Sequence, residues 1–162
     1  MKGVADIAID WLPVELDAFI NRKLFDDRLV ILAREGHPSI NADVGFEGLL
    51  KAKFVGPHRR REIDRLPQAL REYHALGMNE VVRVSELLEI PTVVASTDLL
   101  GIFPSSMGAL MAKRLGLQIL AIPLELPTLP IHMIWHETRR HDAAHRWLRE
   151  FVVLGLSHSG QG

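Results

Sequence analysis

The chain contains no cysteine, and this absence excludes two kinds of structural element. Neither a disulfide framework nor a metal site with thiolate ligands is possible without cysteine. Long apolar runs are also missing, since none approaches the roughly 18 residues that a membrane-spanning helix needs. The first residues, MKGVADIAIDWLP, are interrupted by Asp6 and Asp10, whereas a signal peptide requires a longer uncharged core. These absences favour a protein of the reducing cytoplasm, without a membrane partner.

The chain also lacks an excess of charge and any cluster of glycines. Its 19 basic and 20 acidic residues leave a net charge of −1, which argues against a large nucleic-acid-binding surface. The 12 glycines are scattered, so neither a phosphate-binding loop nor a dinucleotide-binding loop is present. A hydrophobic content of 48% over 162 residues is nevertheless enough for a globular core, in one domain or two small lobes.

Motifs for catalysis or metal binding are incomplete. The H-E-x-x-x-H segment that begins at His136 is one residue longer than the zinc-protease spacing. Ser106 lacks the preceding glycine of a G-x-S-x-G nucleophile elbow. The adjacent carboxylates Asp26 and Asp27 fit a polar step between two strands better than acid–base chemistry. The sequence therefore predicts a protein that is not an enzyme and that uses neither a metal nor a cofactor.

Apolar segments of strand and helix type alternate along the chain, which predicts an α/β fold with largely parallel sheets. The expected strands are 4–9 (buried), 22–25, 28–33, 54–55, 81–84, 99–103, 117–122 and 131–135. The expected helices are 44–51, 63–76, 86–96, 106–115 (closed by Gly116) and 143–154. In the last helix, Ala144, Trp147 or Leu148, and Phe151 share one apolar face. The polar step at Asp26-Asp27 and the proline-rich stretch 123–130 indicate two crossings between lobes, near residues 28 and 125.

Three segments together resemble the effector-binding part of LysR-type transcriptional regulators. They read FDDRLVILAREGHPSI from Phe25, RVSELLEIPTVVASTDLLGIFPSSM from Arg83, and LAIPLELPTLPIHMIWHETRRHDAAHRWLREF from Leu120. The resemblance rests on the order of short motifs along nearly the whole chain. These motifs are D-I-A-I, D-R-L-V, G-H-P, a T-D pair before a strand that ends in proline, and H-R-W-L in the last helix. The sequence also looks similar to the regulators that sense small aromatic acids or plant phenolics.

The resemblance implies a two-lobed fold of the type 2 periplasmic-binding-protein kind, with a small-molecule effector between the lobes. Lobe I would comprise residues 1–27 and 126–162 and be incomplete, whereas lobe II, residues 28–125, would be complete. The DNA-binding domain and the first part of lobe I precede the matched region in the family, so DNA binding is expected only through that missing part. We expect a homo-oligomer, either through helix 62–76 or through an exposed sheet edge that pairs or swaps with another copy.

The resemblance and the ends of the expected strands together predict the effector site. Helix starts there offer free N–H groups and the positive end of the helix dipole. The expected site residues are Trp11, Gly56, Pro57, His58, Arg59, Ser85, Glu86, Phe103, Pro104 and Ser105. Other roles stay open at these positions: Ser85, and Ser106 beside Ser105, as plain helix caps, 59–61 as a solvated basic loop, and Trp11 as a core residue or an exposed edge residue.

Glu86 bears on the chemistry of the effector, because a carboxylate repels an acidic ligand. An aromatic or carboxylate effector would therefore need His58 or Arg59 to compensate for it. Two other functions remain open from the sequence. One is a solute-binding module of the same fold in transport, which the lack of an export signal disfavours. The other is a small α/β hydrolase, which the incomplete catalytic motifs disfavour.

Overall fold

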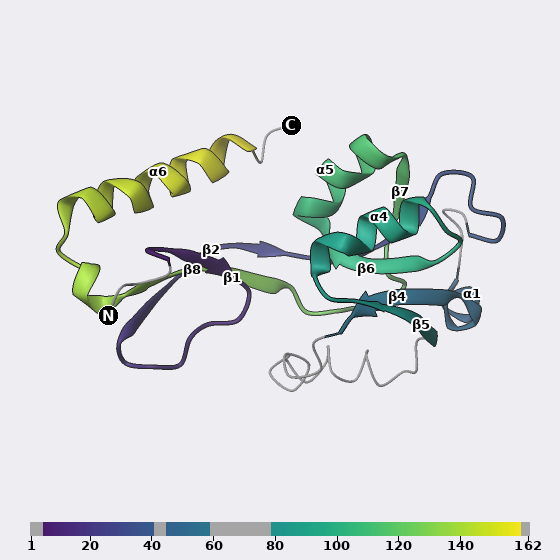
Figure 1. The fold of residues 1–162 in the computed structure, drawn as a ribbon, viewed down its shortest axis with the longest axis horizontal. Helices are drawn as coiled ribbons and strands as arrows, with labels where there is room; N and C mark the ends of the chain where they lie inside the picture. The colour runs from purple at the N-terminus through teal and green to yellow at the C-terminus, as the bar shows by residue number, and fades with distance from the viewer. Residues whose placement is uncertain (1–4, 41–44, 59–78, 160–162) are drawn as a thin grey trace. The chain divides into compact units, whose positions relative to one another are not determined.

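The computed structural model describes residues 5–40, 45–58 and 79–159. The chain forms two compact units, unit 1 from Met1–Asp26 with Pro130–Gly162 and unit 2 from Asp27–Leu129 (Figure 1). Two of the sequence-based expectations, helix 62–76 and the site residue Arg59, lie outside the described residues.

Unit 2 is built on a five-stranded sheet in the order β5-β4-β6-β3-β7. Its strands are β3 (Leu29–Arg34), β4 (Lys53–Pro57), β5 (Asn79–Val84), β6 (Leu100–Pro104) and β7 (Leu117–Leu120). Strand β4 pairs in parallel with β5 and β6, whereas β3 pairs antiparallel with β6 and β7. Four strands therefore share one direction, as predicted for an α/β fold. Strand β3 is the exception, because it begins at the edge where the other four end.

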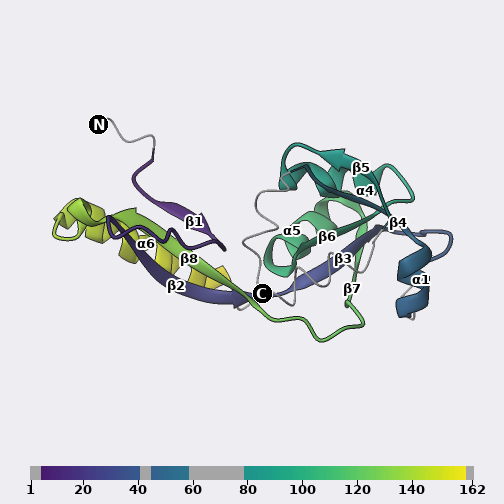
Figure 2. The ribbon, with the colours of Figure 1, turned by 90° about the horizontal axis from the view of Figure 1, so that it is seen from below.

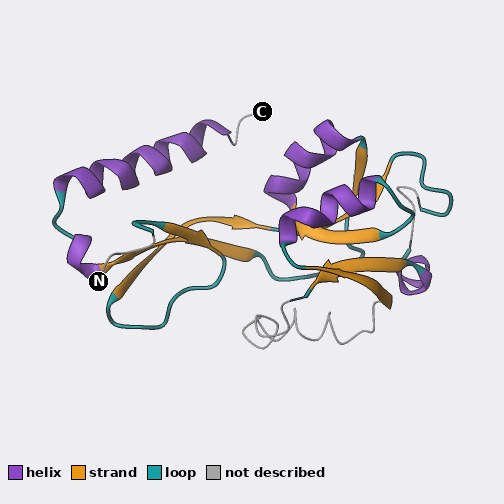
Figure 3. Cartoon of the chain, in the orientation of Figure 1, coloured by secondary structure: helices purple, strands orange, loops and turns teal. Residues whose placement is uncertain are grey.

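Side chains of β3 alternate between two apolar layers, as the period of a strand requires. Ile31 and Ala33 pack in the layer that also holds Leu49 of helix α1 (Phe46–Lys51). Leu32 points to the opposite layer, which contains Phe103 and two buried residues, Ile90 and Val94, of helix α4 (Ile90–Ala95). Helix α5 (Ser105–Leu115) adds methionine side chains to that second layer. The two helices α4 and α5 thus cover one face of the sheet (Figure 3).

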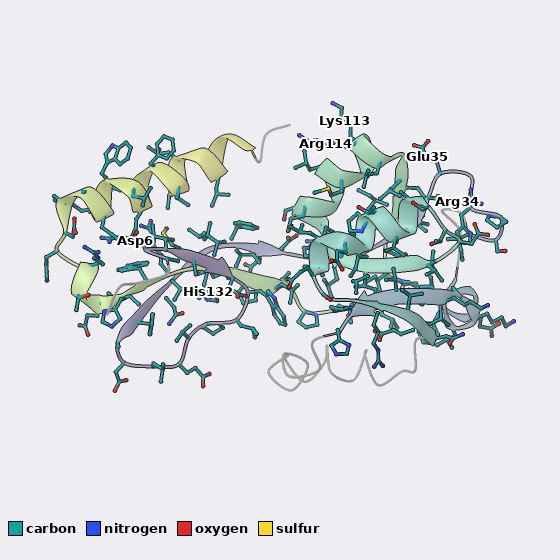
Figure 4. The ribbon with its side chains drawn as sticks, in the orientation of Figure 1. Asp6, Arg34, Glu35, Lys113, Arg114 and His132 are labelled. Carbon is teal, nitrogen blue, oxygen red and sulfur yellow. The ribbon has the colours of Figure 1, made fainter. Side chains whose placement is uncertain are left out.

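Local sequence explains where these helices begin and end. Helix α5 ends at Gly116, whose φ of +64° is the left-handed conformation that glycine adopts readily, and this confirms the predicted stop. Lys113 and Arg114 lie in its last turn, near the negative end of the helix dipole (Figure 4). The helix expected over 86–96 is divided into a 3₁₀ turn η1 (Leu87–Glu89) and α4. Pro91 lies in the first turn of α4. Backbone N–H groups in the first turn have no acceptor within the helix, so proline, which lacks an N–H, is tolerated there.

Unit 1 is built on a three-stranded sheet in which β8 lies between β1 and β2 (Figure 2). The strands are β1 (Ala8–Asp10), β2 (Phe19–Asp27) and β8 (Leu129–His136), and β1 runs antiparallel to β8. The expectation of a buried strand over 4–9 was wrong, because β1 covers only three residues and all of them are exposed. Being the last strand of the sheet, β1 has a neighbour on one side only.

A short 3₁₀ turn η2 (Glu137–Arg139) leads from β8 to helix α6 (Ala143–Ser159), which lies along one face of the unit 1 sheet (Figure 1). The Asp142 carboxylate caps α6 by accepting a hydrogen bond from the His145 N–H, at 3.1 Å. This bond, together with the neighbouring Arg139 guanidinium, lowers the pKa of Asp142. No helix within the described parts of the chain combines the length and the apolar character that crossing a bilayer requires.

The buried face of α6 differs from the one that the sequence indicated. Over residues 143–156 of this helix, the buried residues are His145 and Arg149, and the Arg149 guanidinium lies 4.7 Å from the ring centre of Trp135 on β8. The apolar side chains of Trp147 and Phe151 instead face away from the sheet and are exposed. Periodicity identified an apolar face correctly, but it does not state which face of the helix contacts the sheet.

Candidate functional site

The predicted site residues of unit 2 lie together at one edge of its sheet. Because β4, β5 and β6 run in parallel, their carboxyl ends meet at the same edge. Gly56 and Pro57 end β4 and His58 follows it, Ser85 and Glu86 follow β5, and Phe103 and Pro104 end β6 and are followed by Ser105. Trp11 belongs to unit 1, where it follows β1 and is partly exposed. The carboxyl edge of the unit 2 sheet is thus the candidate functional site.

The connections of the chain single out one point on this edge. The chain leaves β4 toward β5 on one side, whereas it leaves β6 through α5 toward β7 on the other side. Neighbouring strands whose connections run in opposite directions leave a crevice outside their carboxyl ends, and open α/β sheets bind ligands there. In this chain that point lies between the segment Pro57–His58 and the segment Pro104–Ser105.

Backbone hydrogen bonds hold these two segments in place. The His58 N–H donates to the carbonyl of Val84 at 2.8 Å, which ties the residue after β4 to the end of β5. The Ser105 N–H donates to the carbonyl of Arg28 at 2.7 Å, which ties the start of α5 to the start of β3. Both bonds join main-chain groups.

Asp27 occupies the start of helix α5. Its Oδ1 accepts hydrogen bonds from the Ser105 hydroxyl at 2.7 Å, from the Ser106 N–H at 3.2 Å and from the Arg28 N–H at 2.7 Å. Its Oδ2 accepts a hydrogen bond from the Ser106 hydroxyl at 2.6 Å. The residue is only 4% exposed. A carboxylate from the beginning of unit 2 thus takes the position at the helix start where an anionic ligand would otherwise bind.

These contacts set the charge of Asp27. Burial by itself would raise its pKa, but the hydrogen bonds from Ser106, Ser105 and Arg28 outweigh burial, so the pKa lies below its usual value. Asp27 is therefore ionised at neutral pH. The two serine hydroxyls, which the sequence suggested as ligand contacts or as caps, donate to this carboxylate instead, and the N-cap position of α5 is Pro104.

The sequence did not identify Asp27 as part of the site, since it is separated by 78 residues from Ser105. The nearest available signal was the D-R-L-V motif that begins at Asp27, read together with the serine pair that follows Pro104. An acid at a strand start and hydroxyls at a helix start are complementary groups, but no spacing rule connects them.

The start of η1 forms a second polar part of the edge. Glu86 is its N-cap, and Glu89 accepts hydrogen bonds from the N–H groups of Ser85 at 3.1 Å and Glu86 at 3.5 Å. The Glu86 side chain in turn accepts from the backbone N–H of Glu89, and this reciprocal pair of bonds between Glu86 and Glu89 is a capping box. Ser85 is thus not the cap, and both Ser85 and Glu86 are exposed.

Two of the predicted residues, Gly56 and Phe103, are buried. Phe103 is fully buried in the apolar layer beneath α4 and α5, so a ligand at the edge does not reach its ring. Gly56 is also buried, and a Cβ at this position would lie 2.5 Å from Oε1 of Glu80. By contrast His58 is exposed, and Pro57 and Pro104 are partly exposed.

Two of the sequence motifs meet at the opposite edge of the sheet. Arg34, at the end of β3, donates from Nε to Oδ1 of Asp98 at 2.8 Å (Figure 4 labels Arg34). The ring Nε2 of His37 lies 3.1 Å from the carbonyl oxygen of Asp98. The G-H-P and T-D motifs thus hold a turn in place, away from the candidate site. Within the described ranges, no group of three or more histidine, aspartate or glutamate side chains is placed to hold a metal ion.

The family model described as the LysR substrate binding domain matches residues 1–156. The chain belongs to this family. A curated relative, the HTH-type transcriptional regulator SyrM 1 of Sinorhizobium fredii, is 27% identical over 163 residues. The match covers 99% of this chain but 48% of the relative, so the chain spans about half the length of that regulator.

Solved structures show the same fold. A putative transcriptional regulator from Vibrio parahaemolyticus matches with a TM-score of 0.77 at 24% identity, over 98% of this chain and 74% of that one. The regulatory domain of CcmR from Synechocystis PCC6803, solved in complex with 2-PG, matches with a TM-score of 0.71 at 15% identity. That match covers 93% of this chain and 73% of the solved chain. The expected fold class, that of LysR regulatory domains, is thus confirmed.

Proposed function

We propose that this LysR substrate-binding domain senses a small-molecule effector at the carboxyl edge of the unit 2 sheet. The observation that carries the proposal is the crevice position between β4 and β6, where Pro57–His58 and Pro104–Ser105 end neighbouring strands whose connections diverge. The solved relative with 2-PG supports a small-molecule ligand for a domain of this fold. In this proposal units 1 and 2 correspond to lobes I and II.

The proposed role is binding rather than catalysis, in the cytoplasm and without a cofactor. DNA contact is proposed to come from a helix-turn-helix domain, such as the relative's name indicates, rather than from residues 1–162. Self-association is proposed through helix 62–76 or through the exposed edge of β1. A solute-binding role in transport and a hydrolase activity are the alternatives. Turnover of ester or acid substrates by the purified chain would favour the hydrolase.

The charges at the edge limit how an acidic effector is bound. Asp27 already fills the start of α5, and Glu86 adds an exposed carboxylate at the start of η1. An effector carboxylate is therefore proposed to lie near His58 and Arg28, which are exposed at this edge, rather than at either helix start. An aromatic or carboxylate compound remains the proposed class, with its acidic group turned away from Glu86.

A thermal-shift screen tests the proposal, using small aromatic acids and their amides as matched pairs. A ligand present at 100 times its Kd should raise the free energy of unfolding by about 2.7 kcal/mol. His58→Ala should weaken that stabilisation, because His58 is exposed beside the crevice. Asp98→Asn, at the opposite edge of the sheet, is the control and should leave ligand affinity unchanged. Equal affinity in His58→Ala and the unsubstituted chain would argue against this site.

Arg59→Ala tests whether a cation after β4 compensates for Glu86. We expect the affinity for carboxylate ligands to fall roughly tenfold or more, the usual loss for a charge-assisted hydrogen bond. The affinity for the neutral amide analogues should stay the same, since they have no charge to balance. Titration calorimetry of each acid–amide pair measures both. If acids and amides lose affinity equally, or neither loses any, Arg59 has no such role.

A further inference from the structure

The four residues that flank the crevice between β4 and β6 have no backbone N–H group left for a ligand. Pro57 and Pro104 lack an N–H group altogether. The N–H groups of His58 and Ser105 both donate to main-chain carbonyl groups of unit 2, at 2.8 Å and 2.7 Å. A ligand in the crevice therefore finds no main-chain donor at these four residues.

The hydroxyl groups at the start of α5 are also used as donors within the chain. A serine hydroxyl has one hydrogen and two lone pairs that accept hydrogen bonds. Both hydroxyl hydrogens, those of Ser105 and Ser106, point to the Asp27 carboxylate, at 2.7 Å and 2.6 Å between oxygens. This direction is fixed, because an ionised carboxylate has no hydrogen to donate. The Ser106 N–H donates to Oδ1 of Asp27 as well, at 3.2 Å. The two serines thus retain acceptor lone pairs but no donor.

The serine residues are accessible to a ligand, whereas the carboxylate that orients them is not. Ser106 is exposed and Ser105 is partly exposed, but Asp27 is only 4% exposed. The negative charge of Asp27 favours the same polarity in a ligand, because it attracts the positive end of a donor group and repels an acceptor. The start of α5 therefore presents acceptors to the crevice, the reverse of the usual character of a helix start.

A second acceptor lies on the other side of β4. Glu86, which follows β5, places an exposed carboxylate at the same edge of the sheet. Because β4 separates β5 from β6, this carboxylate and the start of α5 are roughly 10 Å apart, twice the spacing of neighbouring strands. The exposed ring of His58, which follows β4, is the side chain between them that has an N–H group to donate.

We infer that the effector presents a hydrogen-bond donor, such as a hydroxyl, amine or amide N–H group, to the oxygens of Ser105 and Ser106. The inference rests on the proposed effector site and narrows its chemistry. An acidic group of the effector lies toward His58 and Arg28, whereas a donor group lies toward α5. A group that can only accept, such as a methyl ether, would face lone pairs there. Asp27 is a positioning residue in this arrangement, since it fixes the direction of both hydroxyls.

Titration calorimetry with substituted benzoates tests this inference. Aminobenzoates and hydroxybenzoates carry a donor on the ring, whereas methoxybenzoates and benzoate itself do not, and all of them share the carboxylate. For at least one ring position, the donor-bearing compound should bind about fivefold more tightly than its methoxy counterpart and than benzoate, the usual effect of one neutral hydrogen bond. Donor-bearing compounds that bind no better than the others, or that do not bind, would overturn the inference.

Serine variants test which oxygens produce the preference, measured as the ratio of the Kd values of the methoxy and donor-bearing compounds. Ser105→Ala or Ser106→Ala should bring this ratio close to one, whereas Ser105→Thr keeps a hydroxyl and should preserve it. Ser96→Ala is the matched control, because the Ser96 hydroxyl also donates within the chain, at 3.0 Å to the Thr92 carbonyl, but lies at the end of α4 and the opposite edge of the sheet. An unchanged ratio in both alanine variants would contradict the inference.

Asp27→Asn tests whether the direction of the hydroxyls matters. The asparagine NH₂ group can donate to a serine oxygen, and the hydrogen of that hydroxyl is then available to a ligand. The ratio should therefore fall below that of the unsubstituted chain or reverse in favour of the methoxy compounds. The measurement is made at a temperature at which circular dichroism shows the variant to be folded. A purely structural role of Asp27 would lower all affinities by the same factor and leave the ratio unchanged.

The proposed site and this inference fail in different ways. If benzoates bind and His58→Ala weakens them all, but donors give no advantage, the site is supported and only the inference is wrong. If His58→Ala leaves every affinity unchanged, the proposed site is wrong as well. The serine and aspartate variants separate the two, because they change the ratio of affinities, whereas His58→Ala is expected to weaken donor-bearing and methoxy compounds alike.

Discussion

Replacing Asp27 with asparagine should lower the free energy of unfolding by about 2–4 kcal/mol at neutral pH, because several hydrogen bonds to a buried charged group are lost or weakened. The carboxylate accepts from both serine hydroxyls at the start of α5 and from two backbone N–H groups. Asparagine keeps one acceptor oxygen, but its NH₂ group takes the place of the other oxygen. That NH₂ group would face a hydroxyl or N–H group that now donates to the carboxylate, and it cannot accept from it. Urea denaturation followed by circular dichroism measures the difference.

The pH dependence separates the charge of Asp27 from its shape. Its pKa is lower in the folded chain than the ordinary value, so the charge stabilises the fold above the unfolded pKa of about 3.9. That stabilisation is lost as the pH falls through the lower, folded pKa. The difference between the original chain and Asp27→Asn should thus be constant between about pH 5 and 7 and shrink below about pH 4. A difference that is the same at acidic and neutral pH would mean that the charge is not the cause.

Asp98→Asn is the matched control for this experiment. Asp98 also pairs with a side chain far away in the sequence, but its own side chain is 59% exposed and that of Arg34 is 33% exposed. Exposed ion pairs usually contribute less than about 1 kcal/mol. A loss at Asp98 as large as the loss at Asp27 would show that burial of Asp27 has no special effect.

Replacing Gly101 with alanine should destabilise unit 2 by about 1–3 kcal/mol, the usual cost of overpacking a core. Strand β6 passes directly beneath α4, and a Cβ at Gly101 would lie 2.4 Å from Cγ2 of Ile90 and 3.0 Å from Cγ2 of Val94. The helix would have to move away from the strand that leads to Pro104. Thermal and urea unfolding measure the loss.

A second substitution tests the cause of that loss. Ile90→Leu removes the methyl group at Cγ2 while keeping the side-chain volume, so it should recover part of the stability of Gly101→Ala. Gly108→Ala is the control, since a Cβ there would meet Val30 at an ordinary 3.4 Å and the position is inside helix α5. That change should be neutral or stabilise by up to about 1 kcal/mol. Absence of recovery in the double variant would show that the clash with Ile90 is not the cause.

Much of the fold follows from local patterns in the sequence. The predicted helix over 106–115 and its stop at Gly116 correspond to α5, and the strand over 99–103 corresponds to β6. Family motifs then indicated the LysR fold, which the family match over residues 1–156 confirms. Such features depend on residues close together along the chain, where periodicity and glycine or proline chemistry act directly.

The details of the candidate site were less accessible from the sequence. Pro57, Ser85 and Pro104 were named from the family resemblance and the ends of the expected strands, and the parallel pairing of β4 with β5 and β6 places those ends at one edge of the sheet. Their role in binding an effector stays a prediction. That Phe103 is buried, and that the serines after Pro104 are held by Asp27, depends on how distant segments pack.

The sequence by itself thus determined the order of the elements, the fold family and the strand ends at which a ligand site was expected. Only the tertiary structure decided which polar groups at those ends have partners already and which face of α6 is exposed. The physical reason is the separation along the chain between the residues that interact. Helix and strand periods arise from neighbouring residues, whereas Asp27 meets Ser105, and Arg149 meets Trp135, through contacts that no local pattern encodes.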